Sequence, residues 1–241
     1  MLDELLDLQR RHGGLAQFRN LACAHQYARL YDLVGRHVPR GSDVLDWGAG
    51  NFHFSYFLVR AGYRATGYTY EATTVPTWLQ SSDYRFVAGS ESDPESIPFG
   101  DESFDAVTSV GVLEHVRETG GSEAASLREI RRILRPGGIV ICYHLPNRFS
   151  VMDMAARLVP GAHHHVYRYS RRSISTLLAA ADLDLLEVRR YAILPRNPLH
   201  KLVATSNESA LFARIYDGID RLLGLVLSPL CTNYCFVAQR P

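Results

Sequence analysis

Lysine is almost absent from this chain, since Lys201 is the only one among 241 residues. A mechanism that depends on a reactive lysine amine therefore has almost no residue to use. Cysteine is also scarce: four scattered residues make no disulfide framework, and they favour a reducing, cytoplasmic location. Apolar runs stay too short for a membrane span, and the start Met1-Leu2-Asp3 leads us to expect no signal peptide.

An excess of charge of either sign is missing as well. The 26 basic residues stand against 25 acidic ones, for a net charge of +1. Nucleic-acid binding usually needs a concentrated basic face. Four arginines do cluster between residues 128 and 135, but they alternate with Leu127, Ile130 and Leu134, as on a solvated helix face. We therefore expect no nucleic-acid partner.

Apolar strand-like runs alternate with helical patterns between residues 43 and 145. In the first unit a strand leads to Asp46, and Phe54, Phe57 and Leu58 then recur at the spacing of a helix face. Such alternation favours a parallel sheet with helices on both faces. Strands are expected at 44–46, 64–70, 84–88, 104–110, 139–143, 183–191 and 232–238.

The turn after the first strand contains Gly48 and Gly50, and it is typical of a site for a nucleotide-like ligand. Glycine permits a positive φ and a close approach of the ligand, which binds at the strand's carboxyl edge against the next helix. Glu71 follows the second strand, where an acidic side chain commonly binds ribose hydroxyls. A dinucleotide fingerprint would need a glycine in place of His53, so the turn alone also admits a site without ligand.

Four blocks in a natural order resemble the class I S-adenosylmethionine-dependent methyltransferases, in particular the small-molecule group called type 11. The resemblance covers residues 43 to 145. It implies a doubly wound, Rossmann-like α/β fold with seven strands, mostly parallel with an antiparallel last strand. The blocks are Val44-Leu45-Asp46-Trp47-Gly48-Ala49-Gly50, Ile97-Pro98-Phe99 with Asp101-Glu102-Ser103-Phe104-Asp105, Gly111-Val112-Leu113-Glu114-His115-Val116, and Arg132-Ile133-Leu134-Arg135-Pro136-Gly137-Gly138.

On this basis the whole chain, residues 1–241, is expected to form a single domain. Residues 1–40 would be an N-terminal helical cap, with helices at 2–12 and 21–38. Residues 41–145 would be the cofactor-binding half. The substrate-side half, 146–241, would include helices near 149–158 and 170–181 and a helical insertion at 194–231.

The resemblance also implies which residues hold S-adenosylmethionine. Gly48 and Gly50 would pass under its methionine part, near Val110 and Gly111, and Asp46 would organise the turn or reach the amino group. Glu71 would hold the ribose. Asp93 would reach the adenine, with Pro94 and Glu95 beside it. Trp47, Asn51, Tyr70 and His115 complete the expected set.

Methyl transfer to an oxygen needs a group that takes up the hydroxyl proton, and histidine suits this near pH 7. His144 closes the fifth strand at the expected edge, while His164 and His165 lie in the loop expected to cover the substrate. The alternatives are a structural histidine at 144 and a metal site in the run 163–165. Consecutive histidines rarely bind one ion without a second ligand cluster, so no metal is expected.

The expected reaction is methylation of a small molecule, on a hydroxyl of a sugar, a lipid-linked metabolite or a quinone or phenol precursor. Phe52 stands where the family often has a third glycine, and a gap-free alignment puts Thr69 at the ribose position. Because of these departures, the chain could instead be a non-catalytic partner subunit with the same fold. A nicotinamide-dependent oxidoreductase is the other alternative, although a Tyr-x-x-x-Lys pair is lacking.

Residues 208–227 form a long apolar stripe that has three interpretations: a lid, the contact of a homodimer, or a helix on a membrane surface. Its charges are mixed, with Arg214 and Arg221 beside Asp217 and Asp220. This mixture favours a lid or a homodimer contact.

Overall fold

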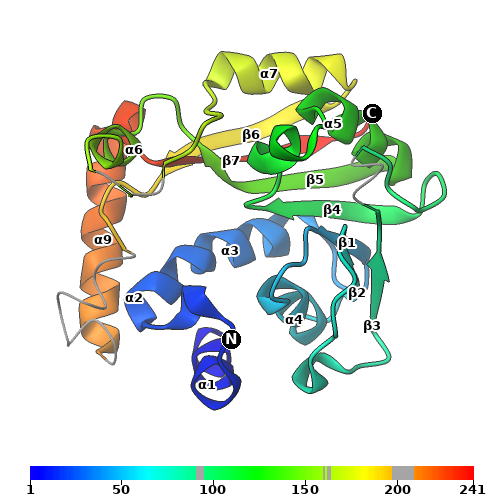
Figure 1. Cartoon of the computed structure of the whole chain (residues 1–241), viewed down its shortest axis with the longest axis horizontal. Coiled ribbons are helices and arrows are strands. Elements are labelled where there is room, and N and C mark those ends of the chain that lie inside the picture. Colours follow the sequence, from blue (N-terminus) through cyan, green and yellow to red (C-terminus); the bar gives the residue numbers. More distant parts are fainter. Residues whose placement is uncertain (91–94, 160, 162–163, 197–208) are drawn as a thin grey trace.

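The computed structural model describes residues 1–90, 95–159, 161, 164–196 and 209–241. A seven-stranded sheet in the order β3-β2-β1-β4-β5-β7-β6 lies at its centre (Figure 1). Only β7 runs antiparallel to its neighbours in this sheet, which confirms the predicted fold class. The strands are β1 Asp43–Trp47, β2 Arg64–Thr69, β3 Tyr84–Ala88, β4 Phe104–Val110, β5 Leu134–Pro146, β6 Asp184–Tyr191 and β7 Asn233–Gln239.

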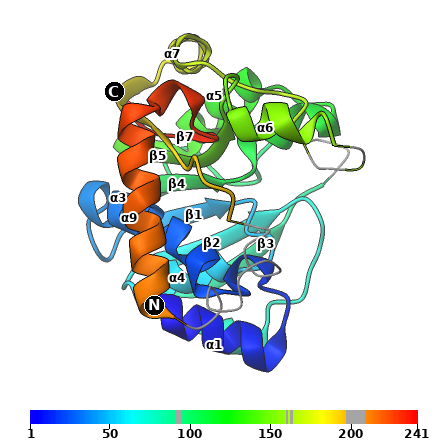
Figure 2. The same ribbon diagram turned by 90° about the vertical axis from the view of Figure 1, so that its left-hand side faces the viewer.

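Helices cover both faces of the sheet (Figures 1 and 2). One face carries α1 Leu2–His12, α2 Leu21–Ala24, α3 Ala28–His37, α4 His53–Arg60 and α9 Ala210–Val226. The other carries α5 Glu123–Ile133 and α7 Arg171–Ala180. The remaining described helices are α6 Val151–Ala156 and the 3₁₀ turns η1 Ala16–Phe18, η2 His25–Tyr27, η3 Thr77–Leu79, η4 Leu113–Thr119 and η6 Ser228–Leu230.

The side chains of β1 show why both faces need cover. Val44 packs into the core under α3 and α4, whereas Leu45 and Trp47 pack into the core on the α5 side. Successive side chains of a strand point to opposite faces, and a strand apolar on both faces must be buried on both. The carboxyl ends of β1, β2, β4 and β5 therefore meet at one edge between two helical layers.

Two elements differ most from their expected bounds. The helix expected over 21–38 is divided into α2, η2 and α3. The fifth strand begins at Leu134 instead of 139, because Leu134 pairs with Phe104 of β4 and hydrogen bonds to the chain continue past Gln239. There the Gly137 N–H donates to the carbonyl of Arg240, and the Arg240 N–H donates to Gly138. Pro136, Gly137 and Gly138, which follow the end of α5, are thus held in a strand by hydrogen bonds to Arg240.

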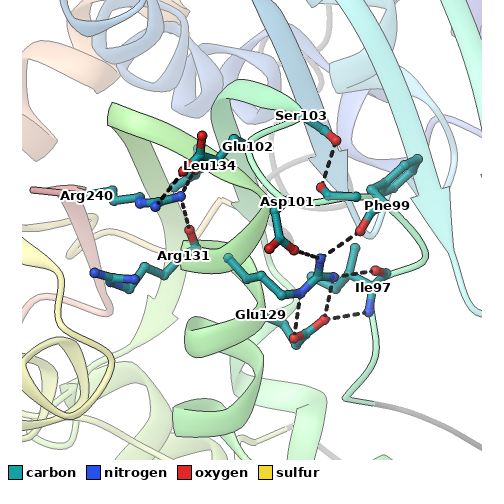
Figure 3. A network of polar contacts seen from close by, with 11 residues as sticks. Ile97, Phe99, Asp101, Glu102, Ser103, Glu129, Arg131, Leu134 and Arg240 are labelled. Carbon is teal, nitrogen blue, oxygen red and sulfur yellow. Dashed lines mark hydrogen bonds and ion pairs between the residues drawn. The ribbon is translucent and has the colours of Figure 1, made fainter.

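Arg132 on α5 fixes the loop that leads into β4, and Figure 3 labels four of its partners: Ile97, Phe99, Asp101 and Glu129. Its guanidinium donates to the carbonyls of Ile97 and Phe99 and forms ion pairs with Asp101 and Glu129 at 2.7 and 2.8 Å. Bidentate charged contacts of this kind give an arginine a fixed geometry. Two of the four blocks, those at 97–105 and 132–138, therefore stabilise the loop before β4. This loop lies away from the edge where the parallel strands end.

Candidate active site

The glycine turn after β1 lies against the start of η4. Gly48 has a φ of 82°, and a Cβ at this position would lie 2.3 Å from Cγ2 of Val112. The N–H groups of Gly48 and Ala49 both donate to the carbonyl of Tyr68 at the end of β2, at 2.8 and 3.0 Å. The turn is therefore held between β2 and η4, and only a residue without a side chain fits at position 48.

Asp46 lies beneath this turn and is buried. Its carboxylate accepts a hydrogen bond from the Ser55 hydroxyl on α4, at 2.6 Å. Burial raises the pKa of Asp46 to about 7, and the bonds from Ser55 oppose that shift. The contact ties the end of β1 to the first turn of α4.

A cavity of about 530 Å³ opens beside the turn, at the carboxyl ends of β1 and β2. Both candidates for the ribose contact, Thr69 and Glu71, lie on its wall, and the Thr69 hydroxyl donates to the Glu71 carbonyl at 2.6 Å. Tyr70 lies between them. We call this cavity the cofactor groove; its lining residues are Gly50, Thr69, Tyr70, Glu71, Thr73 and Thr119.

Phe52 does not line the groove, although it replaces the family's third glycine. Its backbone is left-handed with a φ of 66°, and its ring packs 5.5 Å from Phe86 and 6.4 Å from Tyr84, centroid to centroid. The small apolar cluster that receives the ring also contains Ala49 and Leu79. The groove therefore stays open despite the bulkier residue, at the cost of an unusual backbone conformation.

Several residues expected at the cofactor make other contacts. The Trp47 side chain is buried in the core on the α5 side. The Asn51 amide donates to Gly14 and Gln17, so it fastens the N-terminal segment to the turn. The Glu95 carboxylate accepts from the Ser122 N–H at 2.9 Å. Val110 ends β4 and Gly111 follows it, whereas Asp93 and Pro94 lie outside the described residues.

A second cavity, of about 600 Å³, lies at the carboxyl end of β5. We call it the acceptor cavity. Its walls come from the N-terminal segment, η4, the end of β5, the loop after α6 and the start of β7. The lining residues are Ala16, Gln17, Arg19, Asn20, Cys23, Gln26, Tyr27, Glu114, His144, His165, Thr232 and Asn233.

His144 stands at this cavity in a left-handed conformation, with a φ of 69°. Its Nδ1 lies 2.9 Å from the Tyr191 hydroxyl oxygen, which also accepts a hydrogen bond from the His144 backbone N–H at 2.8 Å. Burial lowers the pKa of His144 to about 4. The ring is therefore neutral at pH 7, and Tyr191 fixes its orientation.

His165 lines the same cavity and is oriented by a buried carboxylate. Asp153 on α6 accepts from the His165 backbone N–H at 2.8 Å, and its oxygen lies 3.3 Å from the ring Nδ1. His164 is exposed and is not among the lining residues. His115 is half exposed, 2.9 Å from Glu118, and also lies outside the lining. The structure thus brings together His144 and His165 but not His164.

Glu114 is the residue that sequence reasoning did not single out. It is only 4% exposed, and burial raises the pKa of its carboxyl group to about 7. Its Oε2 has no hydrogen-bond partner among the described residues. Glu114 belongs to the block 111–116 that resembles the family. The sequence therefore shows its position in a family motif, but not that it is buried at a cavity.

Two further properties concern metals and membranes. In the described part of the chain, no three histidine, cysteine, aspartate or glutamate side chains are grouped so as to hold a metal ion. Among the helices of the described ranges, none combines the length and the apolar character that crossing a membrane requires.

Comparison with known proteins agrees with this geometry. The family profile described as "Methyltransferase domain" matches residues 45–142. A ubiquinone biosynthesis O-methyltransferase of Xanthomonas campestris pv. campestris is 30% identical over 175 residues, which are 66% of this chain and 70% of that protein. A demethylmenaquinone methyltransferase of Roseiflexus castenholzii is 36% identical over 100 residues, 36% of this chain and 39% of that protein.

Among solved structures, a Burkholderia thailandensis 1,6-didemethyltoxoflavin-N1-methyltransferase with bound S-adenosylhomocysteine is similar, with a TM-score of 0.58 and 16% identity. The match covers 99% of this chain and 86% of that one. At this identity the likeness concerns the fold. The sequence relative, the matching profile and the open groove beside the glycine turn together show that the chain belongs to the class I S-adenosylmethionine-dependent methyltransferases.

Proposed function

We propose that this methyltransferase transfers the methyl group to a hydroxyl of a small molecule bound in the acceptor cavity. One observation carries the proposal: the cofactor groove and the acceptor cavity share η4 in their walls, through Thr119 in the first and Glu114 in the second. A reaction between two bound molecules needs their sites side by side. The name of the Xanthomonas relative, an O-methyltransferase, supports oxygen as the acceptor atom.

The chemistry divides simply between cofactor and protein. S-Adenosylmethionine supplies an activated methyl group on a sulfonium, so the protein must align the acceptor and exclude water. A hydroxyl acceptor also needs a nearby group that takes its proton. The acceptor cavity offers side chains that can bind the acceptor or take this proton, Glu114, His144 and His165 among them. The acceptor classes in question remain sugars, lipid-linked metabolites and quinone or phenol precursors.

For the cofactor, we propose contacts along the groove. Glu71 or Thr69 binds the ribose hydroxyls, with Tyr70 beside them on the wall. Gly48 and Gly50 pass under the methionine part, near Val110 at the end of β4 and Gly111 after it. Asp93, Pro94 and His115 stay predictions for the adenine and methionine ends.

A titration separates this proposal from its alternatives. The protein should bind S-adenosylhomocysteine in calorimetry and show no heat with NADH, since a nicotinamide enzyme would reverse the pattern. Phe52 no longer favours a non-catalytic subunit, because its ring packs away from the groove. A screen with methyl-labelled cofactor across sugars, phenols and lipid extracts then tests transfer. Label found only on nitrogen or carbon of the products would contradict a hydroxyl acceptor.

A further inference from the structure

Three residues that line the acceptor cavity each carry a buried polar atom without a hydrogen-bond partner among the described residues. The atoms are Asn20 Nδ2, Glu114 Oε2 and His144 Nε2. They come from the N-terminal segment, η4 and the end of β5, which the fold brings to one place. Leaving such atoms unpaired costs free energy, and native proteins seldom do so without a reason. Because all three residues line one cavity, the structure favours a ligand with several polar groups there.

The rest of the lining has the same character. Nine of the twelve lining residues are polar or charged, and the exceptions are Ala16, Cys23 and Tyr27. Pockets for ligands with long apolar parts are lined mainly by apolar and aromatic side chains. A prenylated phenol has few groups that could pair with the unpaired atoms of Asn20, Glu114 and His144, whereas a ring bearing hydroxyls on several carbons can offer one to each. The lining therefore favours a polyhydroxylated acceptor.

The contacts of His144 determine which of its ring nitrogens carries hydrogen. The Tyr191 oxygen accepts the backbone N–H of His144, so its own hydrogen is directed to Nδ1 at 2.9 Å. The Asn233 amide nitrogen, 3.5 Å away, also faces Nδ1. Because Nδ1 accepts and the ring is neutral, the hydrogen is assigned to Nε2. His144 is thereby a hydrogen-bond donor, and it does not take up the hydroxyl proton.

Glu114 has the complementary character. Its carboxylate can only accept hydrogen bonds, and its Oε2 is one of the three unpaired atoms. A carboxylate withdrawn from water is a stronger base than one in solution. Asn20 resembles His144 instead: its oxygen caps α2 by accepting from the Cys23 N–H at 2.7 Å, which leaves the amide N–H₂ as donor.

We propose that the acceptor is a sugar or cyclitol ring, that Asn20 and His144 donate to its neighbouring hydroxyls, and that Glu114 takes the proton of the hydroxyl being methylated. This inference rests on the proposed O-methylation. The acceptor oxygen forms a bond to the methyl carbon while the carbon–sulfur bond breaks and its electron pair stays on sulfur. The hydroxyl proton passes to Glu114, and the products are a methyl ether and S-adenosylhomocysteine.

The experiment compares two panels of probes with the full chain. Methyl glycopyranosides and inositols form one panel, and catechol and dihydroxybenzoates form the other. Transfer is followed with methyl-labelled cofactor, and binding is followed by calorimetry in protein saturated with S-adenosylhomocysteine. We expect transfer and binding with the first panel. A site built to pair hydroxyl groups rejects compounds that lack them by up to about 10⁴-fold.

Two matched variants assign the roles. Glu114→Gln keeps the shape and an acceptor oxygen, so the best glycoside should bind within about threefold of wild type while transfer falls by roughly 10² or more. Asp32→Asn, at an exposed carboxylate that lines neither the cofactor groove nor the acceptor cavity, should change neither. Asn20→Asp keeps the cap on α2 and replaces the donor by an oxygen, so glycoside binding should weaken by about tenfold.

Each failure has a distinct meaning. Transfer to phenols but not to glycosides would overturn the inference and leave O-methylation standing. If the complex with S-adenosylhomocysteine binds no glycoside or inositol, the assigned acceptor class is wrong. Full transfer by Glu114→Gln would remove this residue as proton acceptor. Absence of any S-adenosylhomocysteine binding would instead contradict the cofactor groove, and with it the proposed function.

Discussion

The cofactor groove and the acceptor cavity are built in opposite ways. Five of the six groove residues come from one stretch, 50–73, and the sixth is Thr119. The acceptor cavity draws its lining from residues 16–27, 114, 144, 165 and 232–233. The groove depends on a backbone turn, whereas the cavity depends on side chains brought together by the whole fold. Local sequence therefore reveals the first site far better than the second.

Their buried carboxylates show the same contrast. Asp46, beneath the groove, is bonded to Ser55 and connects two elements. Glu114, at the cavity, has an oxygen without a partner among the described residues. Burial raises both pKa values to about 7, so the pKa alone does not tell them apart. The hydrogen-bond partners do: the satisfied carboxylate is structural, and the unsatisfied one is the candidate for chemistry.

The largest effect on ligand binding is expected from Gly48→Ala, which changes the cofactor groove and not the acceptor cavity. The new Cβ would lie 2.3 Å from Val112 Cγ2 at a φ of 82°. Strain of about 3 kcal/mol, relieved only by moving the turn, would weaken S-adenosylhomocysteine binding by roughly 100-fold. Calorimetric titration measures this directly.

Two further variants control for stability and for the clash. Gly62→Ala also has a positive φ, 87°, but its Cβ would meet nothing within 4 Å. It should lower the melting temperature and leave cofactor affinity unchanged. Gly48→Ala combined with Val112→Ala should regain part of the lost affinity, since the contacts with both Cγ atoms of Val112 are removed. Unchanged affinity in Gly48→Ala alone would show that the cofactor does not depend on this turn.

Tyr191→Phe perturbs the cavity and should leave the groove intact. It removes the hydroxyl that binds both Nδ1 and the backbone N–H of His144. A loss of one or two such bonds should raise the KM for the acceptor by about 3- to 10-fold, with S-adenosylhomocysteine affinity unchanged. Tyr63→Phe is the control, because its buried hydroxyl binds Val38 far from the cavity. Equal losses in both variants would indicate a general effect on folding.

The same contrast explains what could be predicted from sequence. The alternation of strands and helices and the glycine turn depend on neighbouring residues, so the sheet and the groove were predictable. The cavity depends on contacts such as Tyr191 with His144, 47 positions apart. Neither the burial of Glu114 nor the role of Asp153 has a local pattern. His164 was predicted together with His165 because both lie in the loop expected to cover the substrate, but only His165 lines the acceptor cavity.

Asp46→Asn tests the structural role of the groove's carboxylate through pH. The folded-state pKa of about 7 lies above the unfolded value of about 3.9. The stability that Asp46 contributes is therefore fully present below pH 4 and is lost as the pH rises through 7. Asparagine cannot ionise, so the melting temperature of the variant relative to wild type should rise between pH 5 and 8. A difference that does not change with pH would mean that the carboxyl group is not buried as described.

The smallest effect on catalysis is expected outside both sites, at α9. Figure 2 shows this helix along one side of the molecule, and it packs on α2 and η2. Asp217 and Asp220 pair with the buried Arg196, each at 2.9 Å, so they face the protein. Leu222 and Leu225 face outward, with 63% and 78% of their surface exposed.

An apolar stripe of this kind suits a second copy of the chain. If the predicted homodimer forms through it, Leu225→Arg should reduce the mass measured by light scattering to that of one chain. Turnover should change by less than about twofold, because both sites lie within one subunit. Leu158→Arg, at an equally exposed leucine after α6, should leave the mass unchanged. A wild-type protein that is monomeric at high concentration would exclude the homodimer and return α9 to the interpretation as a lid over the N-terminal helices.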